Sequence, residues 1–145
     1  MIQIKNWKTG EVIFKADVFT VIEAVELAVK QKVSLAFAYL KGADLVGAKL
    51  KRTNLRWADL QGADLRGANL VRAKLDWANF DGANLHRANL RRVNLRRAYL
   101  IGAHLQGADL FKANIRRVDL RGANLVGTKL EEADLTNADI RWAWF

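Results

Sequence analysis

A hydrophobic residue stands at every fifth position from Leu35 to the end of the chain. These residues are Leu except at Phe80, Ile115, Ile140 and Phe145. From position 38 onward the residue two places before each of them is small, almost always Ala, and the residue between the two is mostly Asp or Asn. An α-helix repeats every ~3.6 residues and the faces of a strand alternate, so neither element matches this period. All these residues can share one core only if the chain bends once per pentad, which predicts a coiled tube.

The number of sides follows from the residues two places after each core position. At intervals of twenty these residues fall into classes, such as Gly42, Gly62, Gly82, Gly102 and Gly122 in one series, and Arg52, Arg72, Arg92, Lys112 and Glu132 in another. Intervals of fifteen mix Gly, Trp and Arg. The sequence therefore predicts four sides, and the 22 pentads of residues 36–145 predict about five and a half coils.

The pentads resemble those of the pentapeptide-repeat protein family, whose motif is Ala, then Asp or Asn, then Leu and two variable residues. The resemblance covers about three quarters of the chain, and two of its clearest copies are Ala43-Asp44-Leu45-Val46-Gly47 and Ala63-Asp64-Leu65-Arg66-Gly67. It implies an all-β solenoid in the form of a right-handed quadrilateral parallel β-helix, and the handedness comes from the resemblance alone. We expect this β-helix to occupy residues 35–145.

Residues 1–34 do not repeat and are expected to cover the first coil. Residues 2–14 alternate apolar and polar side chains around a polar turn, which predicts a short β-hairpin. Thr20 and Glu23 have the spacing of a capping box, and the apolar stripe after them predicts a helix up to about Lys32. The end of a solenoid otherwise exposes its core and unpaired strand groups, so we interpret the hairpin and helix as a cap. The alternative is a separate binding role.

The other end of the chain is rich in aromatic residues that no polar segment follows. It carries Ile140, Trp142, Trp144 and Phe145. These side chains either plug the tube or form an apolar surface for a partner. Members of the resembled family often pair end to end, which favours a homodimer through this end over a plugged monomer.

Composition offers little for catalysis or for binding a cofactor. The chain has no Cys, and His86 and His104 have no acidic or nucleophilic partner at a recurrent spacing. Gly residues occur singly at turns and never form a phosphate-binding loop, and the recurrent Asp and Asn are explained by turn hydrogen bonding. We therefore expect no enzyme activity, no cofactor and no metal. No apolar run is long enough to span a membrane and the start lacks a signal peptide, so a cytoplasmic location is the default expectation.

The outer surface is the remaining candidate for function, and it is basic. Residues 36–145 hold 19 Lys and Arg against 11 Asp and Glu, and the whole chain has a net charge of +9. The positive charge concentrates on two adjacent series of turn residues, which also contain two Trp. The candidate contact surface is Arg52, Arg56, Trp57, Arg72, Trp77, Arg91, Arg92, Arg96, Arg97, Lys112, Arg116 and Arg117.

Three functions are weighed for this surface. The leading hypothesis is a rigid protein-interaction or scaffold module with an unidentified protein partner. The alternative is binding of nucleic acid or another polyanion, because exposed aromatic residues beside basic ones are typical of single-strand binding surfaces. Some members of the resembled family modulate DNA gyrase by imitating the negative charge of DNA. The positive charge of this chain disfavours that third function.

Overall fold

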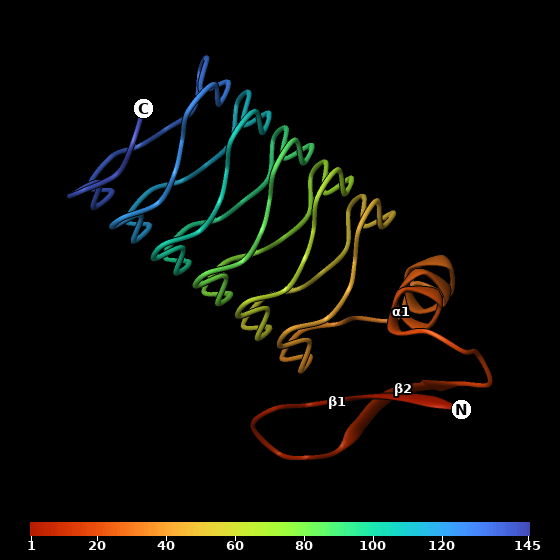
Figure 1. Ribbon diagram of the computed structural model, residues 1–145. Coiled ribbons are helices and arrows are strands. Elements are labelled where there is room, and N and C mark those ends of the chain that lie inside the picture. Colours follow the sequence, from red (N-terminus) through yellow and green to blue (C-terminus); the bar gives the residue numbers. More distant parts are fainter.

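The computed structural model describes all residues from Met1 to Phe145 as a tube of stacked coils with a cap at one end. The cap consists of strand β1 (Ile2–Lys5), strand β2 (Val12–Ala16) and helix α1 (Val21–Lys30). In Figure 1 the coils follow α1 one above the other, and the C-terminus lies at the end opposite the cap. Helix α1 has ten residues, and the structure contains no helix long and apolar enough to cross a membrane.

Parallel β-bridges between residues twenty apart hold successive coils together. They begin with Tyr39 and Asp59 and continue on all four sides as far as Asn124 and Trp144. On each side the core residue donates its N–H to the next coil, as Leu45 does to the Asp64 carbonyl at 2.8 Å. The four-sided tube and its twenty-residue coil, expected from the spacing of the turn residues, are thus confirmed.

Each corner of the tube is a turn with one residue in the left-handed region. In the pentad after Leu40, the Ala43 N–H donates to the Leu40 carbonyl at 3.1 Å, and Gly42 between them has φ of 66°. This arrangement is that of a turn that needs a positive φ at its third position. We call the two residues after each core residue the first and second turn residues. The second turn residue has a positive φ at every corner from Phe37 to Trp142, whether or not it is Gly.

The Asp or Asn before each core residue stabilises the corner that follows it. Its side-chain oxygen accepts a hydrogen bond from the N–H of the first turn residue, as Asp44 does from Val46 at 3.2 Å and Asn79 does from Asp81 at 3.0 Å. This contact recurs along the tube and confirms that the motif position serves turn formation.

Leu and Ala side chains fill the interior of the tube. From Leu45 to Leu125 every core residue is at most 2% exposed, and the small residues are buried beside them. Thr53 and Asp76 are the only buried polar residues of the chain. Burial of a Leu side chain is worth roughly 1.5 to 3 kcal/mol, so the repeat itself drives the coiling.

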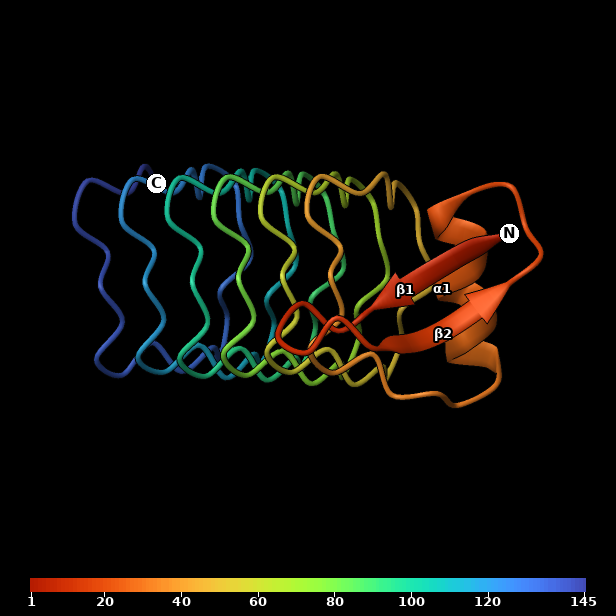
Figure 2. The ribbon, with the colours of Figure 1, turned by 90° about the horizontal axis from the view of Figure 1, so that it is seen from below.

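The hairpin and helix cover the first coil. Thr20 and Glu23 form the predicted capping box, and α1 buries Ala24, Val25 and Ala28 completely. The helix ends at Lys30, two residues before the expected boundary, because Lys32 already adopts a left-handed turn with φ of 59°. In Figure 2 the β1–β2 loop extends over the first coils.

Candidate functional site

Two neighbouring corners of the tube carry the residues of the candidate contact surface. We define the basic corner by its second turn residues, which are Lys32, Arg52, Arg72, Arg92 and Lys112. We define the aromatic corner likewise by Phe37, Trp57, Trp77, Arg97 and Arg117. A single side of the tube, residues 53–55 in its first complete coil, separates the two corners. The structure thus places the candidate residues along the two edges of one side.

The aromatic corner is a continuous stack. The rings of Trp57 and Trp77 are parallel within 5° with centroids 4.8 Å apart, and Phe37 stacks on the other face of Trp57 at 6.1 Å. The Arg97 guanidinium carbon lies 4.8 Å from the centroid of the Trp77 ring. Both faces of each indole are in contact with other side chains, so only the ring edges are accessible to a nucleic-acid base and a base cannot stack on the rings. The stack therefore favours a second explanation for these rings, in which they cover the strand backbone and touch no ligand.

A groove of about 250 Å³ lies beside the aromatic corner. Its lining includes Trp7 from the β1–β2 loop, Trp57, Trp77 and Tyr99, with Asp59 and Asn79 between them. The Trp7 indole N–H donates to the Trp57 carbonyl at 2.5 Å, which fixes the loop of the cap against the coils. Trp7 and Tyr99 were not singled out from the sequence. Phe37 was also missed, although its position twenty residues before Trp57 is a signal that could have been used.

Several basic first turn residues are neutralised by ion pairs, whereas most basic second turn residues are not. Arg91 and Arg116 pair with Asp109 and Asp134 on the sides of the tube, and Arg56 pairs with Asp76, the first turn residue of the next coil at the same corner. Counting turn residues alone had left Asp109 and Asp134 out, so the charge on these two corners is less concentrated than expected. Among the basic second turn residues, only Lys112 has an ion pair, with Glu132 at 3.1 Å.

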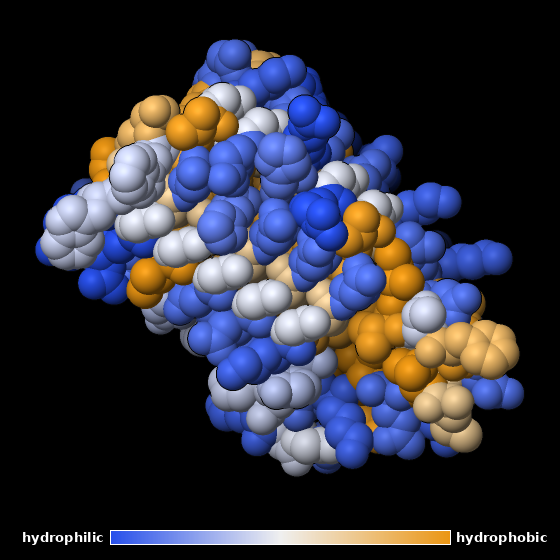
Figure 3. All heavy atoms as spheres, viewed as in Figure 1, coloured by the Kyte–Doolittle hydropathy of each residue, from blue (hydrophilic) through white to orange (hydrophobic).

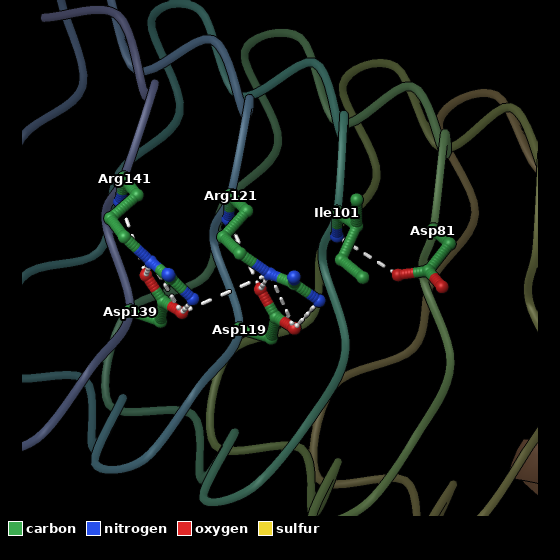
Figure 4. Close-up of polar contacts among 6 residues, drawn as sticks. All are labelled: Asp81, Ile101, Asp119, Arg121, Asp139 and Arg141. Carbon is green, nitrogen blue, oxygen red and sulfur yellow. Dashed lines mark hydrogen bonds and ion pairs between the residues drawn. The ribbon is translucent and has the colours of Figure 1, made fainter.

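The side of the tube that contains Asp119 shows the opposite arrangement, with charges that alternate and cancel (Figure 4). Arg121 contacts Asp119 at 2.7 Å and Asp139 at 3.8 Å, and Arg141 contacts Asp139 at 2.6 Å. The hydrogen bond from Arg141 lowers the pKa of Asp139 to about 2. Burial instead raises the pKa of Asp81, whose carboxylate accepts the Ile101 N–H at 2.9 Å.

The histidines and carboxylates do not gather into a metal-binding cluster. His86 and His104 make no side-chain hydrogen bond, and no three His, Asp or Glu residues lie close enough together to hold a metal ion. The face shown in Figure 3 is mostly hydrophilic along the coils, with hydrophobic side chains gathered near the helix and again near the C-terminal end.

The aromatic residues at the C-terminal end are exposed. The exposed fractions are 44% for Ile140, 74% for Trp142, 67% for Trp144 and 66% for Phe145. These side chains present an apolar surface at the C-terminal end of the tube.

Comparisons with known proteins agree with this architecture. The family model for pentapeptide repeats matches eight copies, within residues 31–67, 48–87, 78–117 and 113–145. The structure is similar to alr5209, a pentapeptide repeat protein from Nostoc PCC 7120, with a TM-score of 0.60 and 25% identity over 86% of this chain and 98% of that one. It is also similar to Rfr23 from the cyanobacterium Cyanothece 51142, with a TM-score of 0.51 and 26% identity over 83% and 96% of the two chains.

A third similar structure is HetL, a pentapeptide repeat protein involved in heterocyst differentiation regulation from the cyanobacterium Nostoc sp. strain PCC 7120. Its identity to this chain is 34%, with a TM-score of 0.31 and coverage of 72% of this chain and 60% of that chain. No curated protein sequence matches the chain. The repeats, the four-sided coil and these matches together show that the chain belongs to the pentapeptide-repeat family and folds as a right-handed quadrilateral β-helix.

Proposed function

We propose that the chain is a non-enzymatic, cytoplasmic scaffold that binds a protein partner through the basic and aromatic corners. The supporting observation is that large side chains occupy second turn positions where Gly would be unstrained. Arg52, Arg72 and Arg92 have φ between 54° and 60°, yet each lacks an ion pair. Left-handed backbone costs a residue with a side chain roughly 1 to 2 kcal/mol. Strain without a local contact to offset it is typical of residues retained for an external one.

The test is a cross-linking pull-down that compares two triple variants. Arg92→Ala, Arg96→Ala and Arg97→Ala together remove unpaired charges from the two corners. The control replaces Arg66, Arg121 and Arg141, which are ion-paired to Asp64, Asp119 and Asp139. Both variants lose the same formal charge. We expect the first to lose the partner and the control to retain it; equal loss in both would reject the two corners as the contact surface.

Binding of nucleic acid or another polyanion is the second candidate for the same surface. The observation that favours it is the row of unpaired cations along the basic corner, since stacked like charges repel one another and a polyanion relieves that repulsion. Filter binding with DNA, RNA and heparin at low salt measures it. Affinity that falls steeply as salt rises is expected, and affinity that is absent or independent of salt would reject this candidate.

We further propose a homodimer through the C-terminal end. The exposed Trp142, Trp144 and Phe145 form an apolar surface beside backbone N–H groups of Leu130 and Leu135 that have no acceptor within the chain. Light scattering should give twice the monomer mass for the wild type and a monomer for Trp144→Ala. A wild-type mass of one chain at high concentration would reject the dimer.

A further inference from the structure

The basic corner is hollowed next to helix α1. Two hollows, of about 280 and 300 Å³, share Lys51 and Arg52, and we call them together the basic groove. The first is lined by Val29, Lys32, Val33, Ser34, Lys51, Arg52, Thr53 and Asn54, and the second by Lys51, Arg52, Val71, Arg72, Arg91 and Arg92. No carboxylate lines either hollow, although the chain has 15 Asp and Glu residues.

The cations of the basic groove are not neutralised within the protein. Lys51, Arg52 and Arg72 make neither an ion pair nor a side-chain hydrogen bond. Arg91 differs, because its guanidinium pairs with Asp109 at 3.0 Å and lies over the Phe111 ring at 4.4 Å. Arg91 therefore forms a fixed wall, while the other basic groups of the groove remain available to a ligand.

A backbone donor is also left without an acceptor in the groove. In most pentads the N–H of the first turn residue donates to an Asp or Asn side chain two residues before it, as Arg56 does to Asn54 at 3.3 Å. The residue two places before Lys51 is Lys49, whose side chain has no oxygen to accept this hydrogen bond. The Lys51 N–H accordingly makes no hydrogen bond within the protein. Unpaired N–H groups among cations are recurrent elements of anion sites.

The hydroxyl of Thr53, which belongs to the buried small-residue series below the first hollow, also lacks a partner. Thr53 is 95% buried, lines the first hollow, and has no hydrogen-bond partner for its Oγ1. Thr128 stands at the same motif position, and its Oγ1 donates to the Leu105 carbonyl at 2.8 Å. The residue at the corresponding distance before Thr53 is Lys30, the last residue of α1, so the coil that would supply the carbonyl is replaced by the helix. A buried hydroxyl without a partner is costly and rare in native proteins.

We propose that the basic groove binds an oligophosphate group, a short chain of phosphoryl units, through Lys51, Arg52 and Arg72. The Lys51 N–H supplies a neutral donor beside these cations. Arg side chains match phosphate oxygens with two parallel donors, and the hollows lie near the lower size limit of ligand pockets, which suits a compact, multiply charged group. The strip of positive charge ends where Glu132 pairs with Lys112, which limits the length of the anion. This proposal deepens the polyanion candidate and rests on the same unpaired cations.

Calorimetric titration of the intact chain with inorganic triphosphate at low salt tests the site. We expect Arg52→Ala with Arg72→Ala to weaken binding by about tenfold or more, since each lost charge-assisted hydrogen bond is worth roughly 1.5 kcal/mol or more. The control is Arg66→Ala with Arg87→Ala, which removes the same charge from two residues outside the candidate contact surface, one of which, Arg87, also has left-handed backbone. It should leave the affinity within about twofold. Equal weakening by both pairs would show a general charge effect and overturn the groove.

A second pair of variants tests the backbone donor. Lys49→Asn and Lys49→Ala remove the same charge, but only Asn offers the Lys51 N–H an acceptor. Triphosphate should shift the Lys51 amide resonance of the wild type, and Lys49→Asn should bind more weakly than Lys49→Ala. A nucleoside triphosphate serves as a parallel ligand, and equal affinity for it assigns recognition to the phosphate chain. If triphosphate does not bind while heparin still does, the groove is refuted and the general polyanion candidate stands.

Discussion

The two ends of the β-helix carry the same repeat but differ in how the last coil is covered. Leu35 and Leu135 lie in the same series, five coils apart. Leu35 is completely buried under the cap, whereas Leu135 is partly exposed. Helix α1 adds three fully buried side chains to the first coil, and nothing equivalent covers Ile140 and the aromatic residues after it.

The hydrogen bonds of the two ends differ in the same way. At the capped end, the Lys49 backbone N–H donates to the Glu26 carboxylate at 2.8 Å, and the Trp7 backbone N–H donates to the Phe37 carbonyl at 3.0 Å. At the other end the N–H groups of Leu130 and Leu135 have no acceptor in the chain. Inside the tube, each coil supplies the hydrogen-bond acceptors that the neighbouring coil needs, but the first and last coils each lack one neighbour. The backbone groups at each end must therefore be paired by residues outside the repeat or by a partner.

Truncation of the matched leucines should give the largest difference between the ends. Leu35→Ala removes a fully buried side chain and is expected to lower the free energy of unfolding by about 2 to 5 kcal/mol. Leu135→Ala should lower it by less than about 1.5 kcal/mol, because the side chain is already partly hydrated. Urea denaturation followed by circular dichroism measures both variants. Equal losses would mean that the C-terminal coil is as well packed as the first.

The contact between helix and tube should give the next largest effect. Glu26→Ala removes the acceptor of the Lys49 N–H, and we expect a loss of about 1 kcal/mol in the free energy of unfolding. Glu131→Ala is the control, because Glu131 is exposed and unpaired in the last complete coil, and it should change stability by less than about 0.5 kcal/mol. Hydrogen exchange of the Lys49 amide provides the local measurement; unchanged protection in Glu26→Ala would contradict the proposed contact.

The fold could be predicted from the sequence because one signal, Leu at every fifth position, is repeated along most of the chain. The same spacing fixes the bridge partners, so the pairing of Asp44 with Asp64 follows from counting twenty residues. The cap was predictable for a different reason, since Thr20 and Glu23 identify the start of the helix locally. In the β-helix and in the cap alike, the local sequence pattern predicts the same structure that the whole chain adopts.

The candidate site could be predicted only in part, because its chemistry depends on contacts between coils. Whether Arg91 is neutralised depends on Asp109, eighteen residues away on the next coil. The stack on both faces of Trp57 and the absence of a partner for Thr53 arise from the geometry of side chains and from the point where the helix replaces a coil. Composition and spacing place these residues on a corner, but side-chain packing determines what they can bind.

Replacing a tryptophan by glycine should change the free energy of unfolding in a different direction at each end. Trp57 and Trp142 both have left-handed backbone, with φ of 62° and 58°. Trp142→Gly relieves strain and loses mainly the contact with Arg141, so it should raise the free energy of unfolding by up to about 1 kcal/mol. Trp57→Gly gains the same relief but loses its stacking on Phe37 and Trp77, and should be neutral or destabilising. Thermal denaturation at low protein concentration decides, and stabilisation of the same size in both would show that the aromatic stack contributes nothing.

Acid should affect the two ends at different pH, and this is the smallest expected effect. Hydrogen bonds from the backbone of Thr20 and Phe19 and from the Thr20 hydroxyl lower the pKa of Glu23 from its ordinary 4.5, and the Arg141 hydrogen bond lowers the pKa of Asp139 from 3.8 to about 2. Each carboxylate is more acidic in the folded protein, so each adds stability that is fully present above its ordinary pKa. That contribution is lost as pH falls, from about 4.5 downward for Glu23 and between 3.8 and about 2 for Asp139. Carboxyl titration by NMR, with Glu23→Gln and Asp139→Asn as assignments, should place the Glu23 carboxyl below 4.5 and the Asp139 carboxyl near 2. An Asp139 that titrates near 3.8 would contradict its ion pair with Arg141, and with it the ordered charges at the C-terminal end.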